Sequence, residues 1–200
     1  KQQQLPASYT MKRSAEMEED VDEAAAACAR PRNTATRPNI LVTGTPGCGK
    51  TETCGSICAR LSTMEHVSVT EVAASIGAHL EWDEERKCQV LDEDAVIDAL
   101  EPRLSKGGYI VDYHAADIFP ERWFDLVLVV RCSTEVLYDR LAARGYDENK
   151  VRENVECEIM QVISEEARES YAPEIVVELQ NETRAHLDAN VERVAVWHAN

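Results

Sequence analysis

Short apolar runs alternate with longer amphipathic segments along the chain from residue 38 onward. The short runs are rich in Val, Ile and Leu, which favour β-strands, whereas the longer segments carry apolar residues at helical spacing. Strands are expected over residues 39–43, 66–70, 107–113, 125–130 and 174–179. Helices are expected over residues 51–64, 92–104, 133–145, 148–171 and 182–200. This alternation predicts a parallel α/β sheet, and the unbroken apolar run 125–130 indicates a strand covered on both faces.

Residues 1–37 show neither pattern, and we expect them to be a disordered leader to one domain over residues 38–200. They contain a run of Gln, a run of Ala and two Pro residues, a composition that does not build a core. The chain of 200 residues is 44% hydrophobic and 29% charged, as in ordinary single-domain proteins. It has neither an apolar window of roughly 18 residues nor a signal-peptide layout, so we expect an intracellular protein without a membrane span.

The formal net charge of −16 disfavours one class of partner. Proteins that wrap nucleic acid by neutralising its phosphates need a basic surface, so direct sequence-specific binding of nucleic acid is not expected. The acidity suits a basic partner, although solubility alone explains it equally well.

The seven cysteines include no CxxC pair, so neither a disulfide framework nor a zinc ribbon is expected. This usage indicates a reducing compartment. Cys54 and Cys58 are four residues apart and would share one face of a helix. Because no second pair completes a tetrahedral site, buried structural thiols are the simpler interpretation than a metal site.

The segment GTPGCGKT over residues 44–51 matches the GxxxxGK[ST] phosphate-binding pattern, and it stands between a predicted strand and a predicted helix. Its backbone N–H groups and the helix N-terminus would hold the phosphates of ATP, with Lys50 reaching the β and γ phosphates. The Thr51 hydroxyl would bind Mg²⁺. The expected nucleotide-binding residues of this segment are Gly44, Pro46, Gly47, Cys48, Gly49, Lys50, Thr51 and the adjoining Glu52.

Glu52 also favours the alternative, a degenerate loop that no longer binds nucleotide. A carboxylate in the first helical turn suits the helix dipole, but it would repel a nearby phosphate.

Asp112 and His114 follow the apolar part of the third predicted strand. In an open parallel sheet the ligand lies beyond the carboxyl ends of the strands, so both side chains are expected near the phosphates. Asp112 would orient Mg²⁺ through its water shell, or it only caps the turn. His114 would position the attacking group or carry a proton, or it is structural. The aromatic segment 119–124 is interpreted as a packed corner rather than a base-stacking platform.

Taken together, these residues resemble the nuclear adenylate kinase-like family known as coilin-interacting nuclear ATPase, the sixth adenylate kinase isoenzyme, within the P-loop nucleoside monophosphate kinases. The resemblance covers residues 38–200. It is carried by PNILVTGTPGCGKT, LDEDAVIDAL, GGYIVDYHAADIFPERWFD, VLYDRLAARGYDENK and NVECEIMQVISEEARESY.

The resemblance implies a five-stranded parallel sheet with helices on both faces, a small monophosphate-binding region over 68–91 and a short lid over 143–153. It places a catalytic arginine at Arg144, with Arg140 one helical turn earlier. A surface arginine paired with Asp139 or Glu148 is the alternative interpretation of Arg144. Relatives usually carry Thr at the position of Glu52. Some have an arginine for the monophosphate near Ala74, a segment that here has none before residue 86.

The family is described as having adenylate kinase and ATPase activities, with ATP and Mg²⁺, and as acting in assembly of the small ribosomal subunit. The resemblance therefore implies AMP or a similar monophosphate, a basic small-subunit ribosomal protein and the pre-ribosome as partners, in the nucleus and cytoplasm. Three functions stay open at this point. They are an adenylate kinase, an ATP-switched assembly ATPase with little AMP kinase activity, and a kinase acting on a metabolite hydroxyl.

Overall fold

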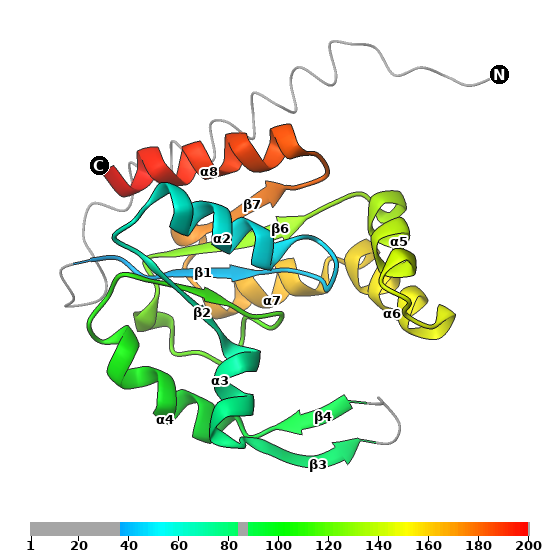
Figure 1. Ribbon diagram of the computed structural model, residues 1–200, viewed down its shortest axis with the longest axis horizontal. Helices are drawn as coiled ribbons and strands as arrows, with labels where there is room; N and C mark the ends of the chain where they lie inside the picture. The colour runs from blue at the N-terminus through cyan, green and yellow to red at the C-terminus, as the bar shows by residue number, and fades with distance from the viewer. Residues whose placement is uncertain (1–36, 84–87, 200) are drawn as a thin grey trace.

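The computed structural model describes residues 37–83 and 88–199, so the expected leader over residues 1–37 lies almost wholly outside the described residues. A five-stranded sheet runs through the centre of the molecule, in the order β2-β5-β1-β6-β7 (Figure 1). Every neighbouring pair in it is parallel. Its strands are β1 (Ile40–Thr43), β2 (Glu65–Ser68), β5 (Tyr109–Asp112), β6 (Leu126–Arg131) and β7 (Val176–Gln180).

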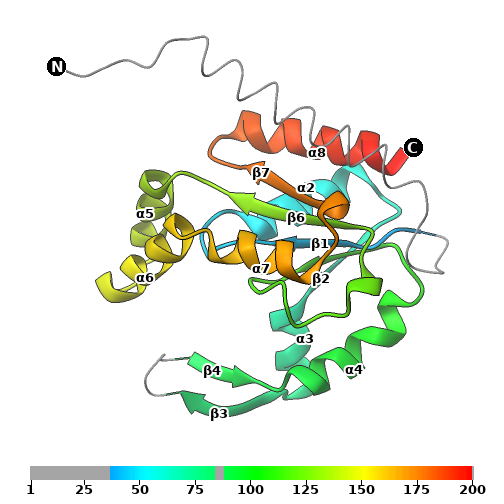
Figure 2. The same cartoon turned by 180° about the vertical axis from the view of Figure 1, so that it is seen from behind.

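Helices cover both faces of this sheet, which confirms the predicted fold class. The helices are α2 (Lys50–Arg60), α3 (Val69–Ile76), α4 (Glu93–Leu104), α5 (Thr134–Ala143), α6 (Glu148–Ile159), α7 (Val162–Ser170) and α8 (Arg184–Ala199). Figure 1 shows α2 in front of the sheet, and the reverse view in Figure 2 shows α7 in front of it. No helix in the described part of the chain has the length and apolar character needed to span a lipid bilayer.

Alternate residues of β1 point into two separate cores, as the two-residue period of a strand requires. Ile40 and Val42 pack in one core, which includes buried side chains of α2, α5 and α8. Leu41 packs in the other core, with buried side chains of α3, α4 and α7. All three β1 side chains are fully buried, so the loop that follows β1 leaves a fixed strand.

The prediction of a single helix over 148–171 was wrong, because the structure has two helices with a break between them. The chain turns at Gln161, whose φ of 58° lies in the left-handed region, so the helical path cannot continue through this residue. α7 then returns to the sheet and packs against β6 and β7, while α6 packs against α5.

The expected strand over 66–70 was too long, and the elements that follow it were not predicted. β2 ends at Ser68, whose side chain accepts a hydrogen bond from the backbone N–H of Glu71 and so caps α3. After α3 comes a separate antiparallel hairpin of β3 (His79–Asp83) and β4 (Cys88–Leu91), which lies apart from the main sheet (Figure 1). The described part of the segment 68–91 is therefore a helix and two paired strands at one edge of the domain.

Candidate nucleotide site

The loop over residues 44–49 joins β1 to α2, and its glycines are required by its backbone. Gly44 has a φ of 138°, and a Cβ atom added there would lie 2.3 Å from the carbonyl oxygen of Val130. Gly49 has a φ of 100° and directly precedes the first residue of α2. The sequence therefore forms the compact loop expected of a phosphate cradle at the N-terminus of a helix.

Lys50 curls back over this loop. Its ammonium group donates hydrogen bonds to the carbonyl oxygens of Gly44 at 2.7 Å and Thr45 at 3.3 Å. Burial lowers the pKa of Lys50, and the positive charge of Arg144 acts in the same direction against the opposing effect of Asp112. The ammonium group is thus held at the mouth of the loop, where it would meet phosphate oxygens.

Asp112 ends β5 and reaches the first turn of α2. Its Oδ2 atom accepts a 2.6 Å hydrogen bond from the Thr51 hydroxyl and lies 3.6 Å from Nε2 of His66. Burial acts to raise the pKa of Asp112, but the neighbouring His66 and Thr51 side chains and the charge of Lys50 together lower it. Asp112 is therefore a carboxylate at neutral pH.

This arrangement fits Mg²⁺ in its donor chemistry. Mg²⁺ prefers oxygen ligands and binds through one or two protein groups, waters and substrate phosphates. Thr51 offers a hydroxyl and Asp112 a carboxylate oxygen beside the phosphate loop. These two side chains are the ones that would hold the ion.

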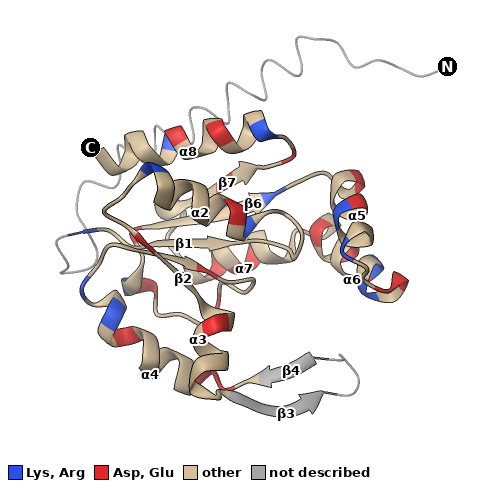
Figure 3. Cartoon of the chain, viewed as in Figure 1, with Lys and Arg blue, Asp and Glu red and all other residues tan. Residues whose placement is uncertain are grey.

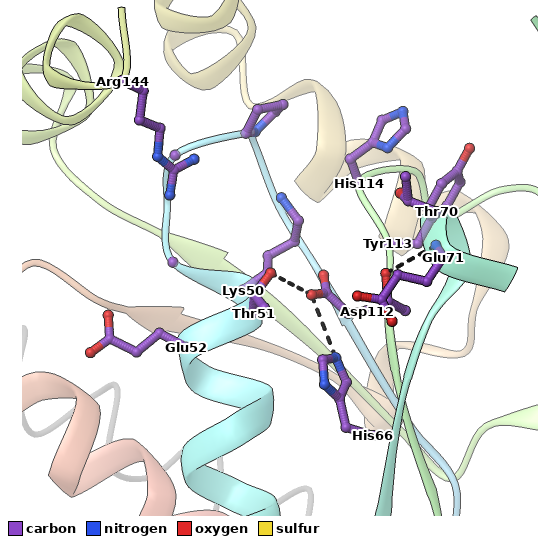
Figure 4. A pocket seen from close by; sticks show the side chains of 14 residues that line it. Lys50, Thr51, Glu52, His66, Thr70, Glu71, Asp112, Tyr113, His114 and Arg144 are labelled. Atoms are coloured by element: carbon purple, nitrogen blue, oxygen red, sulfur yellow. Dashed lines mark hydrogen bonds and ion pairs between the residues drawn. The ribbon is translucent and has the colours of Figure 1, made fainter. Parts of the chain in front are cut away.

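A cavity of about 470 Å³ opens above these groups. Figure 4 shows that side chains from α2, β2, α3 and the end of β5 surround it. The predicted site residues that line it are Pro46, Gly47, Gly49, Lys50, Thr51, Glu52, Asp112, His114 and Arg144. Most of the residues expected to act on a nucleotide therefore share one cavity.

His114 stands at the wall of the cavity, with its ring 4.3 Å from that of Tyr113 between centroids. The ring is accessible from the cavity, yet partial desolvation by the protein lowers its pKa, and the charge of Lys50 lowers it further. His114 is therefore a neutral imidazole at pH 7, able to accept or donate a hydrogen bond toward the cavity.

Arg144 and Arg140 have different places, although they were expected to act together on nucleotide. Arg144 is exposed and lines the cavity (Figure 4). Arg140 does not line it. Its guanidinium instead donates to the carbonyl oxygens of Gly47 at 3.4 Å, Cys48 at 3.3 Å and Glu182 at 3.0 Å. Arg140 thus braces the back of the loop.

Three other predicted residues also depart from the simplest expectation. Gly44 and Cys48 do not line the cavity, and the Cys48 thiol is buried against Cys132, with the sulfur atoms 3.4 Å apart. Glu52 lies at the rim and forms an exposed ion pair with Arg184 over 3.8 Å. Figure 4 shows Glu52 pointing away from Asp112, so the two carboxylates do not converge.

A buried carboxylate supports the loop from below. Glu158 of α6 accepts a 2.5 Å hydrogen bond from the Thr45 hydroxyl and another of 2.5 Å from Nε of Arg131. Arg131 also reaches Glu178 at 3.3 Å. This network joins α6 and β6 to the phosphate loop.

Five cavity residues were not named as site residues: His66, Ser68, Thr70, Glu71 and Tyr113. Of these, Ser68, Thr70 and Glu71 lie in the segment 68–91 that the resemblance implied for the monophosphate. Most of the five surround the start of α3, whose first residues the sequence analysis assigned to the predicted strand 66–70. The spacing of Ser68 and Glu71 is that of an N-terminal capping box, S-x-x-E. That signal would have placed the helix start at the cavity.

Comparisons with known proteins bear on the family of the chain and on its fold. A family model described as an AAA domain matches residues 40–161. The chain is 47% identical over 160 residues to adenylate kinase isoenzyme 6 homolog FAP7 of Saccharomyces cerevisiae, covering 80% of this chain and 81% of the yeast protein. It is 51% identical over 160 residues to the adenylate kinase isoenzyme 6 homolog of Caenorhabditis elegans, with coverages of 79% and 87%.

Among solved structures, the shikimate kinase from Acinetobacter baumannii in complex with shikimate superposes with a TM-score of 0.58. The identity is 17%, and the match covers 80% of this chain and 92% of that one. At this identity the likeness shows the fold alone, that of the P-loop kinases. The identity and coverage of the yeast and nematode relatives show more: the chain belongs to the adenylate kinase isoenzyme 6 family.

Proposed function

We propose that the protein transfers the γ-phosphoryl group of ATP to AMP or a similar nucleoside monophosphate, and more slowly to water. As a member of its family, the chain is an ATP-dependent phosphotransferase. The observation that supports the finer assignment is the convergence of Lys50, Asp112, His114 and Arg144 on one cavity. The relatives' names, adenylate kinase isoenzyme 6 homolog, support the choice of acceptor.

The phosphate loop and two cations provide the electrostatic part of this chemistry. Backbone N–H groups of residues 44–49 hold the phosphates, while Lys50 and Arg144 neutralise charge on the transferring group. Phosphoryl transfer needs positioning and charge neutralisation rather than a covalent enzyme intermediate. Mg²⁺, when bound, shields charge on the β and γ phosphates. Thr51 and Asp112, which share a hydrogen bond, are the residues proposed to orient it.

The start of α3 is the proposed acceptor side of the cavity. Ser68, Thr70 and Glu71 line the cavity there. The N-terminus of α3 adds backbone donors and positive potential that suit a monophosphate. Within this proposal, the segment 68–91 binds the monophosphate and the segment 143–153, which carries Arg144, acts as the lid.

His114 is proposed to position the attacking group. As a neutral imidazole facing the cavity, it would hold the acceptor oxygen or a water molecule by a hydrogen bond. A glycine there removes that contact without blocking the cavity. His114→Gly is expected to slow ATP hydrolysis more than it weakens ATP binding.

The decisive experiment compares ADP formation with and without AMP. The expected result is a rate that rises with AMP and collapses in Lys50→Ala, because the lysine contacts the phosphates. Lys106→Ala, on the exposed turn after α4, is the matched control and should retain the wild-type rate. ATP consumption that is indifferent to every monophosphate would reject the kinase assignment.

A second candidate function is an ATP-switched assembly factor that binds a basic small-subunit ribosomal protein within the pre-ribosome, in the nucleus and cytoplasm. The observation that favours it is the net charge of −16, with acidic residues on every helix (Figure 3). Pull-down of the candidate basic protein with ATP, with ADP and without nucleotide tests this function. Retention that depends on nucleotide supports it, whereas no retention in any state rejects it.

A further inference from the structure

Three possible metal-ligand atoms lie together at one side of the phosphate cavity, where α2, β2 and β5 meet. The Cys54 thiol, an imidazole nitrogen of His66 and a carboxylate oxygen of Asp112 all lie within 4.8 Å of one another. Cys54 stands one helical turn after Lys50 on α2, while the parallel pairing of β2 and β5 brings the other two together. Figure 4 shows the His66 ring directed at Asp112.

The groups beside Asp112 have no task in the proposed phosphoryl transfer. Nε2 of His66 is buried and makes no hydrogen bond within the described part of the chain. Its 3.6 Å separation from Asp112 Oδ2 is too long for a hydrogen bond. The Cys54 side chain is fully buried. The 3.6 Å contact with Asp112 is an ion pair only when the imidazole is protonated. A buried nitrogen without a hydrogen bond costs free energy, which a bound cation would offset.

The spacing suits one ion with three protein ligands. Zinc binds imidazole nitrogen and carboxylate oxygen at about 2.0–2.1 Å and thiolate sulfur at about 2.3 Å, so neighbouring ligand atoms in a tetrahedron are about 3.3–3.6 Å apart. The nitrogen-to-oxygen distance of 3.6 Å is already at this value. The Cys54 sulfur lies within 4.8 Å of the other two ligand atoms, so it would have to move closer by a side-chain rotation, and the fourth ligand would be a water molecule.

We propose that Cys54, His66 and Asp112 form a binding site for a borderline-soft divalent cation such as Zn²⁺. Binding converts the Cys54 thiol to a thiolate and releases its proton, so the thiolate and the carboxylate balance the 2+ charge. Mg²⁺ does not compete well for this set, because it prefers oxygen ligands and the site offers sulfur and nitrogen.

This site shares one carboxylate with the Thr51–Asp112 pair. A zinc ion held by Asp112 removes that carboxylate from the position that suits Mg²⁺. Occupation is therefore inhibitory for phosphoryl transfer, whichever monophosphate is the acceptor. The geometry points to a metal-sensitive control of the nucleotide site.

Cobalt titration of the full chain, freed of metal and nucleotide, tests this assignment. Co²⁺ replaces zinc and gives a near-ultraviolet charge-transfer band only when a thiolate binds it. The expected result is a stoichiometric band that excess Mg²⁺ leaves in place and that Zn²⁺ removes by displacement. In Cys54→Ala the band disappears, and in His66→Phe the Co²⁺ affinity falls at least about tenfold.

Cys58→Ala is the matched control, since Cys58 stands on the same helix one turn further and is half-buried. This variant should keep the full band. Circular dichroism and ATP affinity show whether Cys54→Ala is folded, and His66→Phe tests the site without changing any thiol. No band in the wild type, or a band unchanged in both Cys54→Ala and His66→Phe, would overturn the proposal.

Discussion

The Thr51 hydroxyl donates a 2.6 Å hydrogen bond to Oδ2 of Asp112, although the two residues are 61 positions apart. This contact joins the first turn of α2 to the end of β5. It fixes side by side the two oxygen groups that are proposed to hold Mg²⁺.

Asp112→Asn keeps an acceptor oxygen for Thr51 but removes the negative charge. The rate of phosphoryl transfer should fall about 10²–10³-fold, as when one preorganised electrostatic group is removed. Thermal unfolding should change little. Steady-state kinetics and a melting curve check both parts. Asp117→Asn, an exposed position five residues later, serves as control, and an equal loss in that variant would contradict the assignment.

Arg144→Ala and Arg140→Ala should affect different properties of the protein. Arg144 lines the cavity and is exposed, so its loss should lower kcat at least about tenfold with an unchanged melting temperature. Arg140 holds loop carbonyls from behind, so its loss should lower both the melting temperature and ATP affinity. Kinetics, ATP titration and calorimetry separate the two patterns. The same profile for both variants would argue against two distinct roles.

Glu158→Gln should destabilise the fold by about 3 kcal/mol, the lower end for breaking a buried ion pair. Glu158 is almost fully buried between Thr45 and Arg131, and neutralising it leaves the guanidinium with less compensation. Urea unfolding measures the loss. Glu153→Gln, on the exposed part of the same helix, should stay within about 0.5 kcal/mol of wild type.

Gly44→Ala and Gly55→Ala should change the stability of the protein in opposite directions. The Cβ atom at Gly44 would lie 2.3 Å from a backbone oxygen of Val130, so soluble folded protein should be lost or ATP binding abolished. At Gly55, in the exposed middle of α2, nothing lies within 4 Å of an added Cβ. That substitution should stabilise the protein by about 0.5–1 kcal/mol. Denaturant unfolding and ATP titration give both answers.

Glu166→Gln should raise the melting temperature at neutral pH but not at acid pH. Burial raises the pKa of Glu166, with Asp117 adding to the effect, and Oε2 has no hydrogen-bond partner among the described residues. Because the pKa of Glu166 is higher in the folded protein, ionising this carboxyl group at neutral pH lowers the free energy of unfolding. This loss vanishes as the pH falls below the ordinary pKa of 4.5, where the group is protonated in both states. Melting curves from pH 4 to pH 8 measure the difference.

Glu169→Gln is the control for that pH series, because Glu169 is exposed on the same helix. Its melting temperature should follow the wild type at every pH. A gain in Glu166→Gln that persists undiminished at pH 4 would show that burial of the charge is not its cause.

The sheet and the phosphate loop could be predicted because their signals are local. The apolar run of β1, the glycines after it and Lys50 lie within about a dozen residues of one another. Asp112 could also be placed, since the carboxyl ends of parallel strands meet at one edge. In the structure its side chain accepts a hydrogen bond from Thr51 beside the phosphate loop.

The neighbours of Cys54 and the break at Gln161 could not be predicted in the same way. The sequence suggests Cys58 as the companion of Cys54, yet strand pairing brings His66 and Asp112 to it instead. Strand order is a property of the assembled sheet, so no short segment of the sequence predicts it. Helical periodicity continues on both sides of Gln161, and the turn at this residue lets α7 pack against β6 and β7.

Arg140 belongs to the segment expected to bind phosphate, but its packing in the folded protein directs its side chain elsewhere. The segment VLYDRLAARG places two arginines one turn apart, and both resemble phosphate ligands. Their different directions follow from the contact of Arg140 with the carbonyl of Glu182, a residue of the distant β7–α8 connection. That contact depends on how the last strand is added to the sheet.

The hydrogen bond from the Asn181 side chain to the carbonyl oxygen of Cys48, 2.9 Å long across 133 positions, sets an order of events during synthesis. The phosphate loop is synthesised early, because it lies near the start of the domain. Its contact with Asn181 can form only after β7 has been synthesised. A nascent chain that ends before Asn181 therefore carries the complete motif but lacks this support of the phosphate loop. Nucleotide affinity should appear late in the growth of the chain.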